Sequence, residues 1–418
     1  MMSVTTVIRR TTELDVLLLT AGIWFLAKFI RYAFPPLFGL FQKSYGVSNA
    51  VLGTAFTGFM LVYALMQFPS GVLADRLGSV TVITAGVLVA SIASLTLVVD
   101  SPFVVLVVAM LLMGAGTGAH KTVAVRLLSR AYPARTGRAL GVFDTLGTFG
   151  GVVAPAAVVA VAGMTFALGE SWRLVYLAAG IVGLGFSVAF WRRVPARVPD
   201  DETSGGATSL TVGIAELRRY TPLFFDWRFS VFALLTVLFA FTYNGLVAFA
   251  PLYLTDEAGL TETTAGLLYS GLFLASLVQL VTGELSDRLS QLPIIVATLG
   301  LATLSLVAFV SLTGSVGPVV LGSALVAAGI GAHGFRPVRG AYLMSVLPDE
   351  AAGGGLGVVR TLLMAAGAVA PAIVGVLSEH VGFRPTFWLL ATSVGGATLL
   401  ALGLLVARPQ TRCATTVD

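Results

Sequence analysis

The sequence has little of what soluble domains and enzymes depend on. Only 11% of its 418 residues are charged, and it holds one cysteine and three histidines. Such scarce charge excludes an ordinary soluble domain, whose surface needs more charged side chains. The single cysteine, Cys413, excludes an intramolecular disulfide and a cysteine-based metal site, and the scattered histidines form no metal-ligand cluster.

Sequence patterns of catalysis and nucleotide binding are also missing. No Gly-Lys-Ser/Thr loop is present to cradle phosphates, so direct ATP hydrolysis has no support. No Ser/His/Asp grouping suggests hydrolysis, and the glycine-rich stretches lie inside apolar runs. We therefore expect neither enzymatic activity nor a cofactor.

What the sequence does contain is apolar residues, which make up 57% of it. They form runs of about 20 residues or more, long enough to cross about 30 Å of hydrocarbon as helices. The pattern predicts an all-α polytopic membrane protein whose first span is retained, because residues 1–15 lack a cleavable signal pattern. The twelve predicted spans are 14–38, 49–73, 79–99, 102–129, 137–162, 172–191, 229–250, 262–285, 292–312, 317–345, 354–378 and 384–406.

The basic residues are distributed unequally between the two sides of the membrane. Of 25 lysines and arginines, we place 16 on one side, three on the other and six within the spans. By the positive-inside rule this asymmetry puts both termini in the cytoplasm, in a cytoplasmic (inner) membrane of prokaryotic type. We therefore attribute the net charge of +5 to basic residues on one side of a lipid bilayer, and we do not expect nucleic acid as a partner.

A repeat divides the chain into two related halves. The charged stretch from Gly71 to Gly78 returns in altered form from Gly283 to Ser290, an offset of 212 residues. Further matches follow in the same order, so two homologous six-helix bundles are expected. The predicted domains are an N-terminal bundle (1–191), a polar cytoplasmic linker (192–228) and a C-terminal bundle with a short tail (229–418).

The repeated stretch resembles the signature loop between the second and third spans of the major facilitator superfamily (MFS). The first copy follows the pattern up to Gly78 and then departs, because Ser79 and Val80 stand where the family usually carries basic residues. The resemblance implies two pseudo-symmetric six-helix bundles that rock about a central cavity. It also implies that the first, fourth, seventh and tenth helices line this cavity, and that the fifth and eleventh lie between the halves.

Six cationic residues lie inside the predicted spans, where an ionised side chain costs at least about 2.5–3.5 kcal/mol unless it faces water or a partner. The fourth and tenth spans align at an offset of 215, which pairs Lys121 with Arg336, so we expect these two across the cavity from each other. Asp144 is the one clearly intramembrane carboxylate. The six cations are Lys28, Arg31, Lys121, Arg336, Arg339 and Arg360.

Excess fixed positive charge attracts anions, and arginine is suited to bidentate recognition of carboxylate or phosphate. We therefore predict a small organic anion as substrate. Alternatives stay open for individual cations, which could instead stabilise helix packing or reach the gate. The predicted substrate-binding residues are Arg31, Lys28, Tyr63, Gln67, Lys121, Arg336, Arg339, Tyr243, Asn244 and Gln279.

Within the superfamily, residues 31–71 resemble the anion:cation symporter family of organic-anion carriers. Arg31 lies fifteen residues before Gly46, as in that family's first helix, and residues 63–71 follow its second-helix pattern. The resemblance implies that Arg31 binds a substrate carboxylate and that Tyr63 donates a hydrogen bond to it. The organophosphate antiporters share a first-helix arginine, so "organic anion" is better supported than any one substrate.

The residues that usually couple transport to protons are absent. Ile30, Thr117 and Met110 stand where that family commonly has an aspartate, a glutamate and an arginine. Either another titratable group replaces them, or the carrier exchanges one anion for a counter-anion. The candidate proton-coupling residues are Asp144, His120 and His333.

The sequence thus predicts a monomeric secondary transporter that moves an organic anion by alternating access, as proton symport or as anion exchange. The alternatives are an exporter of drugs or lipophiles and, in another class, a non-transporting membrane sensor. We expect the cytoplasmic gate to involve Asp75, Arg76, Asp287, Arg288, Asp144 and Arg360, with Asp144 paired to a basic residue there.

Overall fold

The computed structural model describes residues 4–195, 225–346 and 364–407, and within them the chain is helical apart from short connections. Twelve helical segments are long and apolar enough to cross a membrane, in agreement with the spans predicted from the sequence. The eleventh segment is described from Met364 onward, so its predicted start at residue 354 lies outside the described residues. Most of the predicted linker lies outside them too.

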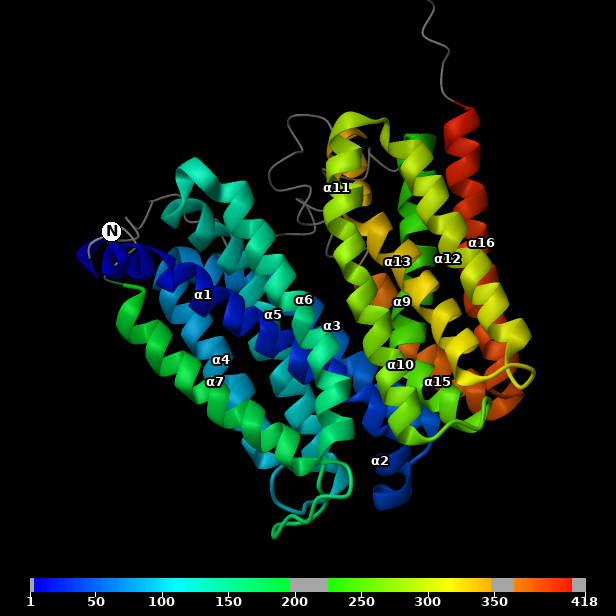
Figure 1. The fold of residues 1–418 in the computed structure, drawn as a ribbon, viewed down its shortest axis with the longest axis horizontal. Helices are drawn as coiled ribbons and strands as arrows, with labels where there is room; N and C mark the ends of the chain where they lie inside the picture. Colours follow the sequence, from blue (N-terminus) through cyan, green and yellow to red (C-terminus); the bar gives the residue numbers. More distant parts are fainter. Residues whose placement is uncertain (1–3, 196–224, 347–363, 408–418) are drawn as a thin grey trace, which may run out of the picture.

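The first bundle contains six of the twelve spans, between Leu14 and Arg193; Figure 1 shows their arrangement. Its first span is broken at Pro35 and Pro36, where the missing backbone N–H groups end α1 and a short 3₁₀ turn, η1, leads into α2. The span continues after this break through α2 to Tyr45, beyond the predicted end at residue 38. The elements are α1 (Val4–Ala33), η1 (Pro35–Leu37), α2 (Phe38–Tyr45), α3 (Asn49–Leu77), α4 (Ser79–Thr96), α5 (Phe103–Ala131), η2 (Pro133–Arg135), α6 (Thr136–Val161) and α7 (Arg173–Arg193).

The second bundle repeats this arrangement, with its second span interrupted by a 3₁₀ turn. Asp226 caps the start of α9 by accepting hydrogen bonds from the backbone N–H groups of Arg228 and Phe229. The elements are α9 (Trp227–Asp256), α10 (Glu262–Leu274), η4 (Ala275–Leu277), α11 (Val278–Arg288), α12 (Gln291–Leu312), α13 (Pro318–Val346), α15 (Ala370–Val381) and α16 (Phe383–Val406).

The stretch that carries the repeated motif is helical rather than a loop. Residues 71–77 form the last two turns of α3, and only Gly78, at φ +83°, separates them from α4. Such a backbone conformation favours glycine, which explains the residue at this position. In the second bundle α11 runs to Arg288, and Leu289 and Ser290 make the connection. The expected loop is therefore shorter than the motif.

The two bundles are inclined toward each other and meet at one end only (Figure 1). The joined end is the end at which α2 stops and α3 begins; the motif end is the end that carries Leu77, Arg288 and Val406. Across the joined end α3 packs against α15, and α6 packs against α10. These two pairs are related by the pseudo-two-fold of the repeat, and the fifth and eleventh spans lie between the halves as expected.

Polar contacts reinforce the joined end. Lys43 forms an ion pair with Glu262 at 3.0 Å, and both side chains are exposed, so the pair contributes little by itself. The backbone N–H of Ala50 donates to Glu379 at 2.8 Å. The backbone N–H of Ala372 donates to the Thr57 hydroxyl at 2.9 Å. The joined end is therefore held by closely fitted helices with a few directional bonds.

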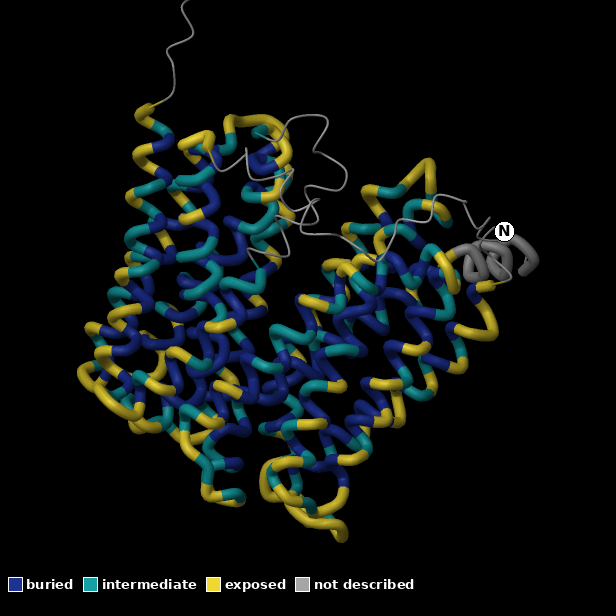
Figure 2. The backbone as a smooth tube through the Cα atoms, turned by 180° about the vertical axis from the view of Figure 1, so that it is seen from behind, coloured by how far each residue is buried: buried dark blue, intermediate teal, exposed yellow. Residues whose placement is uncertain are grey.

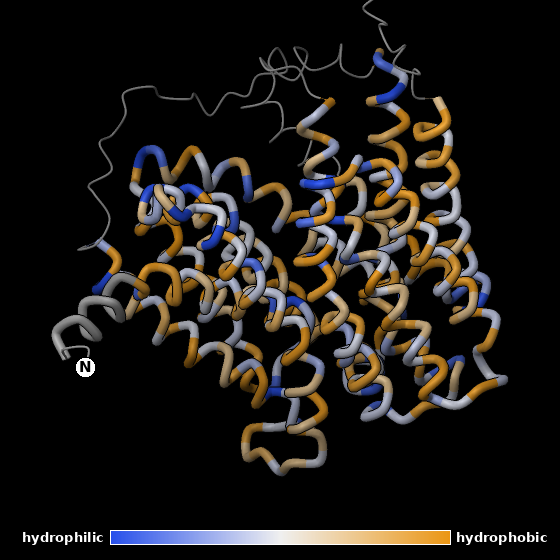
Figure 3. Tube along the Cα trace, turned by 45° about the horizontal axis from the view of Figure 1, so that its top comes forward, coloured by the Kyte–Doolittle hydropathy of each residue, from blue (hydrophilic) through white to orange (hydrophobic). Residues whose placement is uncertain are grey.

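The interior of each bundle is apolar and well buried (Figure 2). Hydrophobic segments cover most of the membrane-crossing length of the helices (Figure 3). Three of the basic residues, Lys43, Arg173 and Arg384, lie at the joined end, in agreement with the predicted minority side. Which end faces the cytoplasm stays a prediction.

Arg173 stabilises the joined end of the first bundle. Its side chain is 4% exposed, and its guanidinium donates to the carbonyl oxygens of Leu97 and Val99, at 2.9 and 2.7 Å, and to Asp100 at 2.6 Å. The carbonyls lie beyond the last turn of α4, where helical partners are lacking. This side chain therefore satisfies a buried acceptor at Leu97 and a partly buried one at Val99.

We expect Arg173→Met to lower the free energy of unfolding by about 3 kcal/mol, because buried carbonyls lose charged donors. Asp100→Asn should cost less than about 1 kcal/mol, because the Asp100 side chain is 88% exposed. Thermal unfolding of the two purified variants in detergent measures the difference. Equal losses would mean that the ion pair, and not the carbonyl contacts, carries the stabilisation.

Candidate functional site

A cavity of about 690 Å³ lies between the two bundles. Its lining comes from α1, α3, α5 and α6 of the first bundle and from α9, α10, α11 and α13 of the second. The first, fourth, seventh and tenth spans thus line it as expected, and the second, fifth, eighth and, through Met364, the eleventh contribute as well. The cavity extends from Tyr32 and Phe273, near the joined end, to Met344 toward the motif end.

All ten residues predicted to bind substrate line this one cavity. They come from six different helices and from both halves of the chain. Their common placement is a finding of the structure, whereas their contact with a substrate stays a prediction. The ten are Lys28, Arg31, Tyr63, Gln67, Lys121, Tyr243, Asn244, Gln279, Arg336 and Arg339.

Arg31 is the most enclosed of the cationic residues in the cavity. Its residue exposure is 7%, and its guanidinium carbon lies 3.7 Å from the centroid of the Tyr63 ring. Stacking on this ring fixes the guanidinium plane while its N–H edges stay available. The Nε atom of Arg31 is buried without a hydrogen-bond partner among the described residues. A buried donor of this kind favours an acceptor supplied by a ligand.

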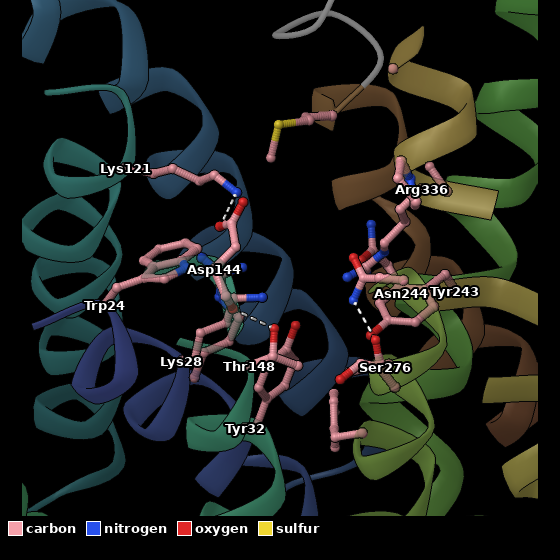
Figure 4. Close-up of a pocket in the computed structure, with 18 of the residues that line it drawn as sticks. Trp24, Lys28, Tyr32, Lys121, Asp144, Thr148, Tyr243, Asn244, Ser276 and Arg336 are labelled. Atoms are coloured by element: carbon pink, nitrogen blue, oxygen red, sulfur yellow. Dashed lines mark hydrogen bonds and ion pairs between the residues drawn. The ribbon is translucent and has the colours of Figure 1, made fainter. Parts of the chain in front are cut away.

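Lys28 and Lys121 flank the indole of Trp24, each with Nζ 5.2 Å from the ring centroid. Lys121 forms an ion pair with Asp144 at 3.0 Å, between α5 and α6 (Figure 4). Lys121 belongs to the cavity wall, and the Asp144 side chain is 56% exposed. Pairing of Asp144 with a basic residue at the gate stays a prediction.

Arg336 and Tyr243 form the corresponding wall of the second bundle. The Arg336 guanidinium carbon lies 4.2 Å from the centroid of the Tyr243 ring. Figure 4 shows Lys121 and Arg336 on opposite walls, as the internal repeat predicts. Pro337 follows directly in α13 and removes one backbone donor, which loosens the helix beside this arginine. Arg339 packs one turn away over the ring of Phe335, at 5.9 Å.

The two histidines are placed differently from Asp144. His120 is buried behind Trp24, with Nε2 3.1 Å from the carbonyl oxygen of Thr20, and does not line the cavity. His333 is buried behind Tyr243 and Phe273, with ring centroids 5.6 and 6.3 Å away. Of the three candidate coupling residues, Asp144 is the one that lines the cavity.

Among the described gate residues, the ion pairs of Asp75 and Arg288 each lie within a single bundle. Asp75 forms an ion pair with Arg126 of α5, inside the first bundle. Arg288 forms an ion pair at 2.6 Å with Glu284 on its own helix. Arg76 and Asp287 are exposed at the motif end, and Arg360 lies outside the described residues. Closure of the motif end by these residues therefore stays a prediction for another state.

Sequence reasoning missed several residues of the cavity. Trp24 and Tyr32 lie on the same face of α1 as Lys28, spaced by four residues on either side, so helical periodicity gave a usable signal. Ser276 and Phe273 had no comparable signal, because Ser276 lies in η4, which interrupts the span, and Phe273 lies in the last turn of α10 before it. In the described part of the chain, no group of three or more metal-ligating side chains is found.

Comparison with known proteins agrees with the architecture. The chain is 25% identical to a hexuronate transporter of Bacillus subtilis, over 87% of this chain and 85% of the relative. It is 25% identical to a probable sulfoacetate transporter of Cupriavidus necator, over 87% and 86%. It is also 27% identical to a multidrug resistance protein B homolog of Mycobacterium tuberculosis, over 85% and 70%.

The fold also matches solved structures. A bacterial homolog of the human lysosomal transporter Spinster, in an inward-facing and occupied conformation, superposes with a TM-score of 0.76 at 18% identity. The alignment covers 94% of this chain and 97% of that one. The sequence profile of the Major Facilitator Superfamily matches residues 20–335. This protein therefore belongs to the Major Facilitator Superfamily and is a twelve-helix membrane transporter rather than an enzyme.

Proposed function

We propose that this transporter moves a small organic anion, such as a carboxylate, across the cytoplasmic membrane by alternating access. One observation carries the proposal: three cations of the cavity lining, Lys28, Arg31 and Arg336, form no ion pair with a carboxylate of the described residues, and the one described carboxylate of the lining, Asp144, is paired with Lys121. The uncompensated positive charge is stabilised when an anion enters. The relatives named for hexuronate and sulfoacetate support the same chemical class.

The described conformation corresponds to one step of the cycle. With both termini in the cytoplasm, as the distribution of basic residues predicts, the motif end is the inner end and the joined end is the outer end. The cavity then accepts or releases substrate on the cytoplasmic side. Differential binding of the anion to the two facing states drives the exchange between them.

The test is ligand-induced stabilisation of the purified full chain by mono-, di- and sugar-carboxylates, phosphate esters and lipophilic cations. A ligand that binds only the folded state raises the melting temperature by mass action. Stabilisation by one class of organic anion is expected, followed by uptake of that anion into liposomes. If no anion stabilises the protein or is transported, the proposal is wrong.

A second candidate is export of drugs or lipophiles. The multidrug relative supports it, and so do apolar and aromatic side chains in the cavity, such as Phe149, Phe239 and Leu280. Stabilisation by lipophilic cations alone would favour this candidate. It would also mean that the cavity cations serve helix packing.

We further propose that Asp144 couples transport to protons. An anion in the cavity competes with Asp144 for Lys121, and the released carboxylate can then accept a proton. Asp144→Asn is expected to abolish anion accumulation driven by a pH gradient. It should preserve anion-for-anion exchange, with equal or tighter anion binding, because the cavity loses its one described negative charge.

Uptake into liposomes, with and without an imposed pH gradient, measures the two activities separately. Asp256→Asn, at the joined-end terminus of α9, is the matched control and should transport normally. Gradient-driven accumulation by Asp144→Asn at the wild-type level would exclude Asp144 as the coupling group. It would favour obligatory anion exchange.

A further inference from the structure

Two arginines in the cavity lie over tyrosine rings, one in each bundle. Arg31 of α1 stacks on Tyr63 of α3, and Arg336 of α13 stacks on Tyr243 of α9. The distances from guanidinium carbon to ring centroid are 3.7 and 4.2 Å. A stacked guanidinium presents its N–H groups at the edge of its plane, in the fork geometry that matches a carboxylate or sulfonate.

Neither of these arginines forms an ion pair with a carboxylate of the described residues. The first bundle neutralises Lys121 with Asp144, whereas the second bundle offers Arg336 no equivalent acid. The repeat explains this difference, because the position that matches Asp144 at an offset of 216 is Arg360 in the sequence. Two guanidinium forks, one in each bundle, therefore line the cavity without a carboxylate partner among the described residues.

The two forks face a common space. Figure 4 shows Lys28 and Tyr32 on one wall and Arg336 and Tyr243 on the other. Tyr32 lines the same cavity as Arg31 and Arg336, and its ring centroid lies 4.2 Å from that of Phe273 in the second bundle. A ligand seated beside Tyr32 can thus contact both bundles at once.

The number of oxygen atoms limits how many arginines one acidic group can bind in bidentate geometry. A single carboxylate has two oxygens and fills one bidentate fork. Its binding to Arg31 leaves the fork of Arg336, on the facing wall, without a bidentate partner. Water can solvate that fork but leaves its charge uncompensated. A second anionic group on the same ligand provides both the oxygens and the charge.

We propose that the substrate is a dianion with an acidic group at each end, one held by Arg31 and the other by Arg336. The inference rests on the proposed transport of organic anions and specifies the class of anion. Such a ligand ties α1 and α3 of the first bundle to α9 and α13 of the second. Binding is thereby linked directly to the approach of the two bundles.

The experiment compares matched monoanions and dianions on the purified full chain. Galactonate and galactarate share one carbon skeleton and differ in whether C6 carries a hydroxyl or a carboxylate; 4-hydroxybutyrate and succinate form a shorter pair. We expect the dianion of at least one pair to bind about tenfold or more tightly than its monoanion, since a polar site discriminates against an analogue that leaves its groups unpaired.

Arg336→Gln should reduce this preference at least about fivefold by weakening the dianion more than the monoanion. Arg336→Lys, which keeps the charge without the fork, should give an intermediate preference. Arg384→Gln, an exposed arginine at the joined end, is the control and should change neither affinity. The melting temperature of each variant reports that it is folded.

Equal affinity for the members of both pairs would overturn the proposal. So would an Arg336→Gln variant that weakens monoanion and dianion by the same factor, because Arg336 would then help to bind a single acidic group. In both cases the transport of organic anions would stand. If none of the four anions nor any other organic anion binds, the proposed function itself fails.

Discussion

Substitution of Arg31 by alanine is expected to abolish anion uptake while leaving the protein folded. The guanidinium is nearly enclosed, is stacked on Tyr63, and has a buried Nε without a partner among the described residues. Loss of one member of a buried charge-assisted pair costs about 2–5 kcal/mol, so the affinity should fall about 30-fold or more. Uptake of labelled anion into liposomes and ligand-induced stabilisation both measure the loss.

Two further variants separate charge from geometry. Arg31→Lys keeps the positive charge but not the planar fork, so it should restore part of the binding at most. Arg192→Ala, at the exposed C-terminal end of α7, removes an arginine far from the cavity and should transport normally. Normal transport by Arg31→Ala would remove Arg31 from the substrate site and shift attention to Arg336 and Lys28.

Much of this architecture could be predicted because an ionised side chain in hydrocarbon has a high free-energy cost. Each cation within a span must face water or a partner, so Lys28, Arg31, Lys121 and Arg336 could be assigned to the cavity before any helix was placed. The internal repeat added a second constraint by pairing Lys121 with Arg336. Physical cost and pseudo-symmetry together identified residues that all line one cavity in the structure.

Contacts between particular side chains could not be predicted in the same way. Lys121 and Asp144 are 23 residues apart on neighbouring helices, and Asp75 pairs with Arg126 across 51 residues. Hydropathy fixes where a helix crosses the membrane but not its rotation against a neighbour, which decides these pairs. The helical course of residues 71–77 was missed because a charged, glycine-containing stretch also has the composition of a turn.

The conformational state could not be predicted from the sequence either. The sequence shows which helix faces are apolar and where small residues allow close helix contact, but these features do not say which facing state the bundles adopt. The structure supplies the missing information at the joined end, where Gly53 of α3 lies against α15. There the backbones of α3 and α15 lie so close together that the described conformation leaves no room for a side chain at position 53.

Replacement of Gly53 by valine is expected to destabilise the described conformation relative to a state that is open at the joined end. A Cβ atom at this position would overlap the backbone carbonyl oxygen of Pro371, and a backbone group cannot move aside as a flexible side chain can. Overpacking of this kind costs about 1–3 kcal/mol or more, enough to shift a two-state equilibrium about 5- to 150-fold. The population should move toward a state that is open at the joined end, and transport should cease.

The separation of Lys43 and Glu262 reports this shift, because their side chains are 3.0 Å apart when the joined end is closed. Spin labels at these two positions, in a Cys413→Ser background, should give a short distance in the parent and a longer one in Gly53→Val. Loss of the exposed Lys43–Glu262 pair itself changes little. Gly185→Val, whose Cβ would meet nothing within 4 Å, is the matched control and should keep the short distance. An unchanged distance in a folded Gly53→Val protein would show that α3 and α15 can separate locally without opening the joined end, so that close packing at Gly53 would not be what selects the facing state.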